Sequence, residues 1–220
     1  MGALTYFTGP MNCGKSTLAL QIDYTETDAG RRGYRFTRQD RSGQARITSR
    51  IGLDEPAIEV DDDFGFWSFV ASELTAGRRV DFLVCDEAQF YTTTQVDELA
   101  RLVDDLGVDV FCFGILTDFR TELFPGSRRL IELCDRIELL QARPRCWCGA
   151  FATHNARIVD GEMVTEGSQV ALGDTDQRRA AQVRYEVLCR RHHRLRQTAA
   201  KGRVDPSPDP LPFEPGAGPS

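Results

Sequence analysis

Short apolar runs alternate along the first 140 residues with longer segments in which apolar side chains recur at helical spacing. Apolar runs of this length predict buried strands, and recurrence every three or four residues predicts amphipathic helices. The expected strands are residues 3–8, 34–37, 57–60, 80–87, 108–114 and 136–140. The expected helices are residues 16–30, 64–76, 94–106 and 127–134. This alternation predicts an α/β fold with a mainly parallel sheet and helices on both faces.

Two local features refine this pattern. The helix over residues 64–76 is expected to be capped at Asp62 or Asp63 and to end at Gly77. Residues 38–52 are polar, rich in arginine and contain glycine, so we expect a mobile loop there. It is either a solvated surface segment or an arginine cluster that stabilises a transferring phosphoryl group.

The pattern changes after residue 141. Asp160-Gly161 separates two alternating runs and predicts a hairpin. Soft metal ligands flank this hairpin on both sides, and the best four are Cys146, Cys148, Cys189 and His192. They predict a structural zinc site that would hold a small domain together. His193 competes with His192, and free cysteines beside a surface histidine pair are the alternative.

These features divide the chain into a nucleotide-binding core of residues 1–141, a small zinc-binding domain of residues 142–200 and a tail of residues 201–220. The tail is rich in proline and has little to bury, so we expect it to be disordered.

Composition narrows the class of protein. The chain has 220 residues, of which 41% are hydrophobic, and its apolar runs are far too short to span a bilayer. It starts with no signal peptide, so we expect a cytoplasmic protein with no membrane partner. The net charge of −6 gives no support to binding of nucleic acid. Seven cysteines do not form a disulfide framework, and Cys85, Cys112 and Cys134 are expected in the core.

Residues 9–16 carry the chemistry that organises the chain. They read Gly-x-x-x-x-Gly-Lys-Ser directly after the first predicted strand, which is the phosphate-binding loop. Its main-chain N–H groups would bind phosphate oxygens, Lys15 would reach the β- and γ-phosphates, and Ser16 would bind Mg²⁺. The chain has only two lysines among its 27 basic residues, Lys15 and Lys201, so a lysine at this position is not incidental. The expected ATP-binding residues are Gly9, Pro10, Met11, Asn12, Cys13, Gly14, Lys15, Ser16 and Thr17.

Two carboxylates end the strand over residues 80–87. Asp86 follows an apolar run, as does the aspartate that holds Mg²⁺ in other phosphate-loop proteins. The next strand leads into the loop of residues 115–126, which carries Phe119 and Phe124. These rings either line a pocket or pack the loop down. Because ligands bind at the carboxyl ends of parallel strands, the three segments are expected to share one site.

The motifs together resemble the type II thymidine kinases. The resemblance rests on Gly-Pro-Met-x-x-Gly-Lys-Ser-Thr at residues 9–17, Asp-Glu-Ala-Gln-Phe at 86–90, Thr-Asp-Phe at 117–119, Cys146 with Cys148, and Tyr-Glu-x-Leu-Cys-Arg-x-His at 185–192. It covers about residues 1–196. It implies a RecA-like core with a zinc-bearing lasso domain. It also implies transfer of the ATP γ-phosphoryl group to the 5′-hydroxyl of thymidine, and of deoxyuridine, in nucleotide salvage.

The resemblance also assigns roles to residues. Glu87 matches the general base, and Arg41 matches a flexible-loop arginine that steadies the transferring group. The residues that match positions around the nucleoside base are Met11, Phe90, Phe119, Phe124 and Tyr185, together with the main chain of Val170, Ala171, Leu172 and Gly173. The family further implies a homotetramer and feedback inhibition by dTTP.

The chain departs from the family pattern in three places. The first zinc pair is Cys-x-Cys instead of Cys-x-x-Cys, the link of residues 174–184 is longer, and the flexible loop reads Gln-Asp-Arg at residues 39–41. Two other functions remain open at this point: a zinc-containing regulator that uses the phosphate loop as a switch, and a kinase for a different small molecule.

Overall fold

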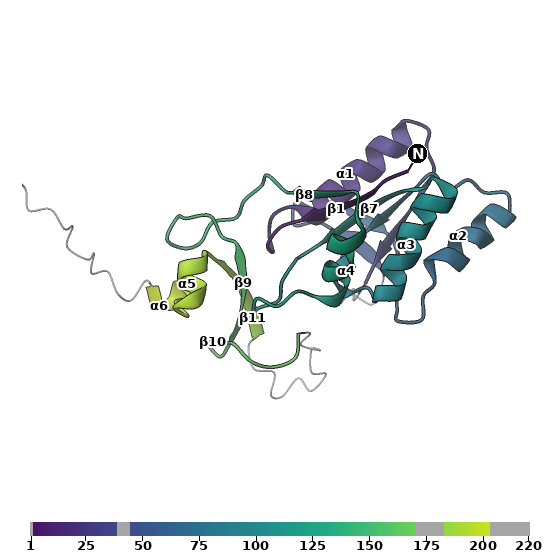
Figure 1. The fold of residues 1–220 in the computed structure, drawn as a ribbon. Coiled ribbons are helices and arrows are strands. Elements are labelled where there is room, and N and C mark those ends of the chain that lie inside the picture. The colour runs from purple at the N-terminus through teal and green to yellow at the C-terminus, as the bar shows by residue number, and fades with distance from the viewer. Residues whose placement is uncertain (1, 39–44, 170–182, 203–220) are drawn as a thin grey trace, which may run out of the picture.

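A computed structural model describes residues 2–38, 45–169 and 183–202 (Figure 1). Its main sheet has six strands in the order β5-β2-β6-β7-β1-β8, and every neighbouring pair is parallel. These strands are β5 (Ile58–Glu59), β2 (Gly33–Thr37), β6 (Phe82–Cys85), β7 (Asp109–Gly114), β1 (Leu4–Thr8) and β8 (Arg136–Leu139). The α/β architecture predicted from the periodicity is confirmed.

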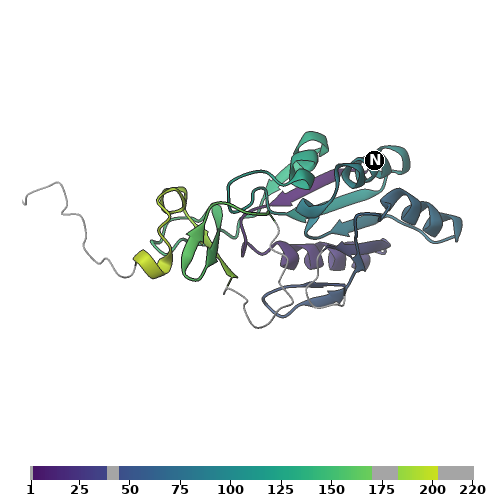
Figure 2. The same cartoon turned by 90° about the horizontal axis from the view of Figure 1, so that it is seen from below.

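Helices cover both faces of this sheet (Figures 1 and 2). On one face lies α1 (Lys15–Asp28), where Ala19 and Leu20 pack with Phe82 and Phe113. The other face is covered by α2 (Phe66–Thr75), α3 (Thr93–Leu106) and α4 (Pro125–Leu133), whose apolar side chains form the larger core with the sheet. Cys85 and Cys112 lie fully inside that core and Cys134 packs against it, as predicted.

Helix boundaries follow local capping chemistry. Thr92 and Gln95 form a capping box at the start of α3, and Gly107 ends the helix with a φ of 68°. The predicted cap of α2 at Asp62 or Asp63 is wrong, because Gly65 is the N-cap residue and no side chain caps the helix. Gly77, with a φ of 77°, follows the end of α2 as predicted.

The prediction of a loop over residues 38–52 is wrong in part. Strand β3 (Arg46–Thr48) pairs antiparallel with β4 (Asp54–Pro56), and Ile47 is buried against the α1 side of the sheet. A single apolar side chain among polar neighbours gives no alternating pattern, so the sequence did not predict this strand. Residues 39–44 lie outside the described part of the chain.

The parallel register brings three loops to one edge of the sheet. Thr8 pairs with Gly114 and Cys85 pairs with Cys112, so the chain leaves β1, β6 and β7 at the same end. The phosphate loop, the Asp86-Glu87 pair and the segment after β7 therefore lie beside one another, as the sequence predicted.

A small antiparallel sheet follows the main one (Figure 1). It has the order β10-β9-β11, from β9 (His154–Val159), β10 (Glu162–Val164) and β11 (Val183–Leu188), and is followed by the short helices α5 (Arg190–Arg194) and α6 (Ala199–Gly202). Asp160 and Gly161 have φ angles of 50° and 86°, so the predicted hairpin turn is confirmed.

Two further expectations concern the ends of the molecule. The tail predicted to be disordered falls largely on residues 203–220, outside the described residues. In the described part of the chain, every helix is too short or too polar to cross a membrane.

Candidate active site

The phosphate loop connects β1 to α1 through a backbone that few residues adopt. Asn12 and Gly14 have φ angles of 67° and 84°, and Gly14 is the N-cap residue of α1. Lys15 Nζ donates to the carbonyl oxygen of Pro10 at 3.0 Å and to that of Gly9 at 3.4 Å. The ammonium group thus lies against the loop, where phosphate oxygens would bind.

Asp86 lies directly beside this loop. Its carboxylate is buried, lies near the Ser16 hydroxyl and accepts the main-chain N–H of Glu87 at 3.0 Å. Burial, followed by the negative charge of Glu87, raises the pKa of Asp86 to about 6. A hydroxyl and a carboxylate that lie near each other are suitable ligands for Mg²⁺, whose charge would favour the ionised carboxylate.

Glu87 occupies a constrained position at the end of β6. Its φ of 53° is uncommon for a residue with a side chain, and the following turn is the 3₁₀ helix η1 (Ala88–Phe90). Gln89 Nε2 donates to Glu87 Oε2, while Gln89 Oε1 accepts the main-chain N–H of Ile115 at 3.2 Å. The buried Gln89 therefore fixes the direction of the Glu87 carboxylate.

The loop after β7 is folded around another aspartate. Asp118 is buried and accepts hydrogen bonds from the main-chain N–H groups of Arg120 and Glu122 and from Arg120 Nε. Because all of these donors lie within the same loop, Asp118 stabilises the conformation of the loop. Phe119 and Phe124 are also buried, so their rings pack this loop inward.

A cavity of about 190 Å³ lies between η1, α4 and the small domain. Its lining includes two predicted base contacts, Phe90 and Phe124. Their rings pack edge to face, with 5.4 Å between the ring centres. The other lining residues are Arg38, Gln89, Tyr91, Pro125 and Gln169. An apolar ring pair with a few convergent polar groups suits a planar heterocycle. Met11, Phe119 and Tyr185 are not among the described residues that line it.

The small sheet contacts this site through β9. Asn155 is buried; its Oδ1 accepts the main-chain N–H of Met11 at 2.8 Å and its Nδ2 donates to the Thr117 carbonyl oxygen at 3.3 Å. One side chain therefore joins the phosphate loop, the loop after β7 and the small domain. No sequence motif pointed to Asn155, because its role depends only on tertiary contacts.

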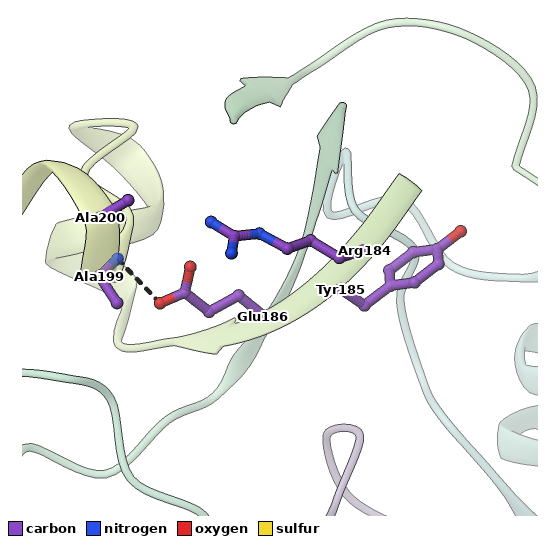
Figure 3. A pocket seen from close by; sticks show the side chains of 5 residues that line it. All are labelled: Arg184, Tyr185, Glu186, Ala199 and Ala200. Carbon is purple, nitrogen blue, oxygen red and sulfur yellow. Dashed lines mark hydrogen bonds between the residues drawn. The ribbon is translucent and has the colours of Figure 1, made fainter. Parts of the chain in front are cut away.

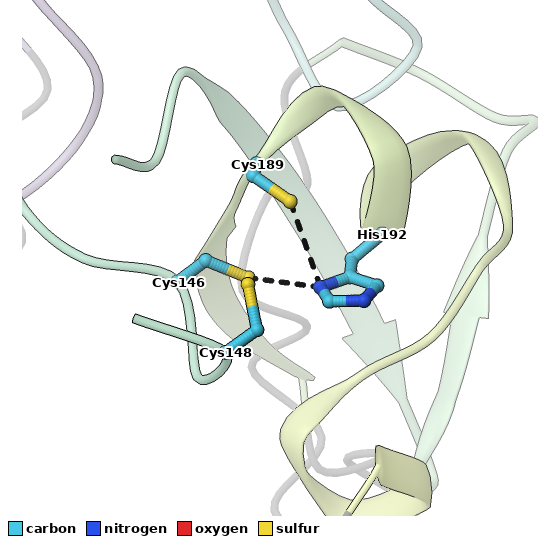
Figure 4. A group of neighbouring side chains, drawn as sticks. All are labelled: Cys146, Cys148, Cys189 and His192. Carbon is cyan, nitrogen blue, oxygen red and sulfur yellow. Dashed lines mark hydrogen bonds between the residues drawn. The ribbon is translucent and has the colours of Figure 1, made fainter. Parts of the chain in front are cut away.

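The four predicted zinc ligands come together in the small domain (Figure 4). Their ligand atoms all lie within 4.8 Å of one another, with His192 Nδ1 at 3.3 Å from Cys146 Sγ and 3.5 Å from Cys189 Sγ. Burial, and then Arg191, lower the pKa of His192, which favours the neutral imidazole that a metal ion binds. The set fits a tetrahedral zinc ion despite its Cys-x-Cys spacing.

His193, the other candidate, faces away from the cluster. Its Nε2 lies at 3.0 Å from the Phe119 carbonyl oxygen, and its ring lies 5.0 Å from that of His154. The geometry therefore selects His192.

A larger cavity, of about 360 Å³, lies between β11 and α6 (Figure 3). It is lined by Arg184, Tyr185, Glu186, Ala199 and Ala200, and Glu186 accepts the main-chain N–H of Ala199 at 2.9 Å. Tyr185 is a predicted nucleoside contact, but none of these residues belongs to the phosphate loop or to β6.

Some predicted residues fall outside the described part of the chain. They are Arg41, Val170, Ala171, Leu172 and Gly173. Sequence reasoning also missed several residues at the site, namely Arg38, Gln89, Tyr91, Asn155 and Gln169. Of these, Gln89 lies inside a recognised motif, and Gln169 directly precedes the predicted base-binding segment.

Comparisons with known proteins give one consistent result. A family model described as thymidine kinase matches residues 2–193. A thymidine kinase of Cutibacterium acnes is 56% identical over 214 residues, which cover 97% of this chain and 98% of that protein. A thymidine kinase of Streptomyces avermitilis is 55% identical over 96% of this chain and 98% of that protein. One of Salmonella typhimurium is 35% identical over 88% and 91%, respectively.

Proposed function

The chain belongs to the thymidine kinase family, and we propose that it transfers the γ-phosphoryl group of ATP to the 5′-hydroxyl of thymidine, giving dTMP. We extend this proposal to deoxyuridine, which lacks only the base methyl group. The observation that carries it is the buried Asp86, which lies beside Ser16 of the phosphate loop and is followed directly by the oriented carboxylate of Glu87.

On the donor side, the main-chain N–H groups of residues 9–17 would bind the ATP phosphates and Lys15 would neutralise the β- and γ-phosphates. Ser16 and Asp86 would hold Mg²⁺, which supplies charge neutralisation to the transferring group when bound. Arg41 is proposed to steady that group.

On the acceptor side, Glu87 would accept the proton of the 5′-hydroxyl. Phosphoryl transfer depends chiefly on alignment and charge stabilisation, so a carboxylate fixed by Gln89 suits late removal of a proton. The base would lie against Phe90 and Phe124 in the cavity of about 190 Å³. Met11, Phe119, Tyr185 and the main chain of residues 170–173 are proposed to complete its surroundings.

The remaining parts of the proposal concern the whole protein. Cys146, Cys148, Cys189 and His192 would bind a structural zinc ion that stabilises the small domain of residues 142–200, beside a kinase core of residues 1–141. We further propose a cytoplasmic homotetramer that works in nucleotide salvage and is inhibited by dTTP.

An ATP-dependent assay of the purified protein with a panel of nucleosides tests the function. We expect phosphorylation of thymidine and deoxyuridine, with cytidine and purine nucleosides much slower. Absence of turnover with thymidine and deoxyuridine, in protein that holds zinc and binds ATP, would refute the proposal.

A further inference from the structure

Arg157 is a buried cation in the middle strand of the small sheet. Only 6% of the surface of this residue is exposed to solvent. Nε donates to the Tyr185 hydroxyl at 3.1 Å, and the two terminal nitrogens donate to the main-chain carbonyl oxygens of Ser168 and Gln169, each at 2.8 Å. All three nitrogens of the guanidinium group are therefore engaged.

Aromatic rings complete its surroundings. The guanidinium carbon lies 3.9 Å from the centre of the Phe119 ring and 5.7 Å from that of Tyr185. Among the described residues, Arg157 takes part in no ion pair, so carbonyl dipoles, a hydroxyl group and ring faces stabilise its charge. A charge buried in this way is costly unless its partners are precisely placed.

Three partners of Arg157 belong to the proposed nucleoside site. Phe119 and Tyr185 match nucleoside contacts of the family, and Gln169 lines the cavity that holds Phe90 and Phe124. Gln169 also donates from Nε2 to the Leu123 carbonyl oxygen at 3.4 Å, in the loop after β7. One guanidinium group thus joins three segments around the acceptor site: the loop after β7, β11 and residues 168–169.

The position of Arg157 on β9 links these contacts to the donor side. Asn155 and Arg157 are two residues apart on the strand, so their side chains lie on the same face of the small sheet. Asn155 binds the phosphate loop through Met11. Arg157 instead binds Tyr185 and residues 168–169, which we call the nucleoside wall together with Phe119. The separation of these two tasks predicts that a change at Arg157 affects the nucleoside more than ATP.

We propose that Arg157 is a positioning residue that assembles the nucleoside wall before thymidine binds, by fixing Phe119, Tyr185 and Gln169 relative to one another. This inference rests on the proposed function. Arginine is required because its planar fork reaches three acceptors and a ring face at once, whereas the single ammonium group of lysine cannot. Preorganisation of this kind lowers the ordering cost that substrate binding would otherwise meet.

The test compares Arg157→Lys and Arg157→Met with the matched control Arg184→Met in the full-length protein that holds zinc. Arg184 lies on the neighbouring strand and points toward α6, away from the side that Tyr185 faces (Figure 3). We expect both Arg157 variants to raise the KM for thymidine by about tenfold or more, in line with the loss of hydrogen bonds to a charged group. The KM for ATP and the zinc content should stay at the wild-type values, and Arg184→Met should match the wild type throughout.

A double-mutant cycle sharpens the result. Tyr185→Phe removes only the hydroxyl that accepts from Arg157, so its effect on thymidine binding should be much smaller in the Arg157→Met background than in the wild type. Additive effects would contradict the assigned contact.

Three results would overturn the inference: an unchanged KM for thymidine in Arg157→Lys, equal increases in both KM values, or loss of zinc from the Arg157 variants. Calorimetric titration of each protein with thymidine alone separates this failure from failure of the proposed function. If the wild type binds no thymidine, the function fails and the inference fails with it. If Arg157→Lys binds thymidine as tightly as the wild type, only the inference fails.

Discussion

At the scale of single residues, the site depends on Glu87, whose direction is set by the buried Gln89. Replacing Glu87 by Gln keeps the shape of the side chain and removes its ability to accept a proton. A general base contributes about 10²- to 10⁴-fold, so we expect kcat to fall by about that factor with ATP affinity unchanged. Steady-state kinetics with thymidine and calorimetric titration with an ATP analogue measure the two effects.

The matched control for this prediction is Glu132→Gln on the exposed side of α4, where the carboxylate pairs only with Arg129 among the described residues. It should retain wild-type kinetics. A rate for Glu87→Gln close to that of the wild type would show that Glu87 is not the base.

A second residue-scale prediction concerns Glu73, far from the active site. Its carboxylate pairs with Arg78 and accepts the hydroxyl hydrogen of Tyr34, and these contacts lower its pKa from 4.5 to about 2. Because the pKa is lower in the folded state, the stabilisation is present above pH 4.5 and is lost as the pH falls toward the folded-state pKa. The difference in urea midpoint between the wild type and Glu73→Gln should therefore shrink below about pH 4.5. A difference that stays constant from pH 7 to pH 4 would contradict this linkage.

At the scale of elements, the periodicity predicted the six parallel strands and the main helices, because the central strands and the helices share continuous apolar cores. The edge strand β8 was predicted as well, although it is exposed and not buried as expected. It failed at β3, where only Ile47 is buried and its polar neighbours leave no alternating pattern in the sequence. It also misplaced the start of α2, where two aspartates resemble caps but Gly65 takes that position. Signals that depend on one residue were therefore less reliable than those shared by several.

The start of α3 offers a test at this scale. Thr92 accepts the main-chain N–H of Gln95, and the Gln95 side chain accepts that of Thr92. Replacing Thr92 by Ala should lower the free energy of unfolding by about 1 kcal/mol, because the main-chain N–H of Gln95 loses its partner at the helix start. Urea denaturation measures the loss, and Thr93→Ala, one residue into the helix, is the control. An equal loss in the two variants would show that the capping box does not stabilise α3.

At the scale of the whole molecule, the sequence predicted which segments meet but not what joins them. Parallel strands must deliver residues 9–17, Asp86 and the loop after β7 to one edge, so this part of the site was predictable. Asn155 and Arg157 gave no signal, because an asparagine and an arginine in a short strand are ordinary residues until their partners are placed. The spacing of the cysteines predicted the zinc cluster, but only the fold distinguished His192 from His193.

The coupling between the zinc cluster and the active site leads to the last prediction. Cys146 and Cys148 precede β9, and Cys189 and His192 follow β11, so the cluster fixes the ends of the two strands that carry Asn155 and Tyr185. Loss of the metal should loosen these strands and, with them, the nucleoside wall. The phosphate loop would lose at most the hydrogen bond from Met11 to Asn155, because it connects β1 to α1 and both of these elements pack in the core.

Cys148→Ser is the best probe of this coupling, since Cys148 is the exposed member of the cluster and its replacement leaves the core packing intact. We expect loss of bound zinc, a decrease of about tenfold or more in thymidine affinity, and an ATP affinity close to that of the wild type. Cys134→Ser, which changes a cysteine outside the cluster, should retain zinc and both affinities. Equal losses of thymidine and ATP binding would mean that the metal supports the whole fold, whereas zinc loss without any effect on thymidine would separate the cluster from the site.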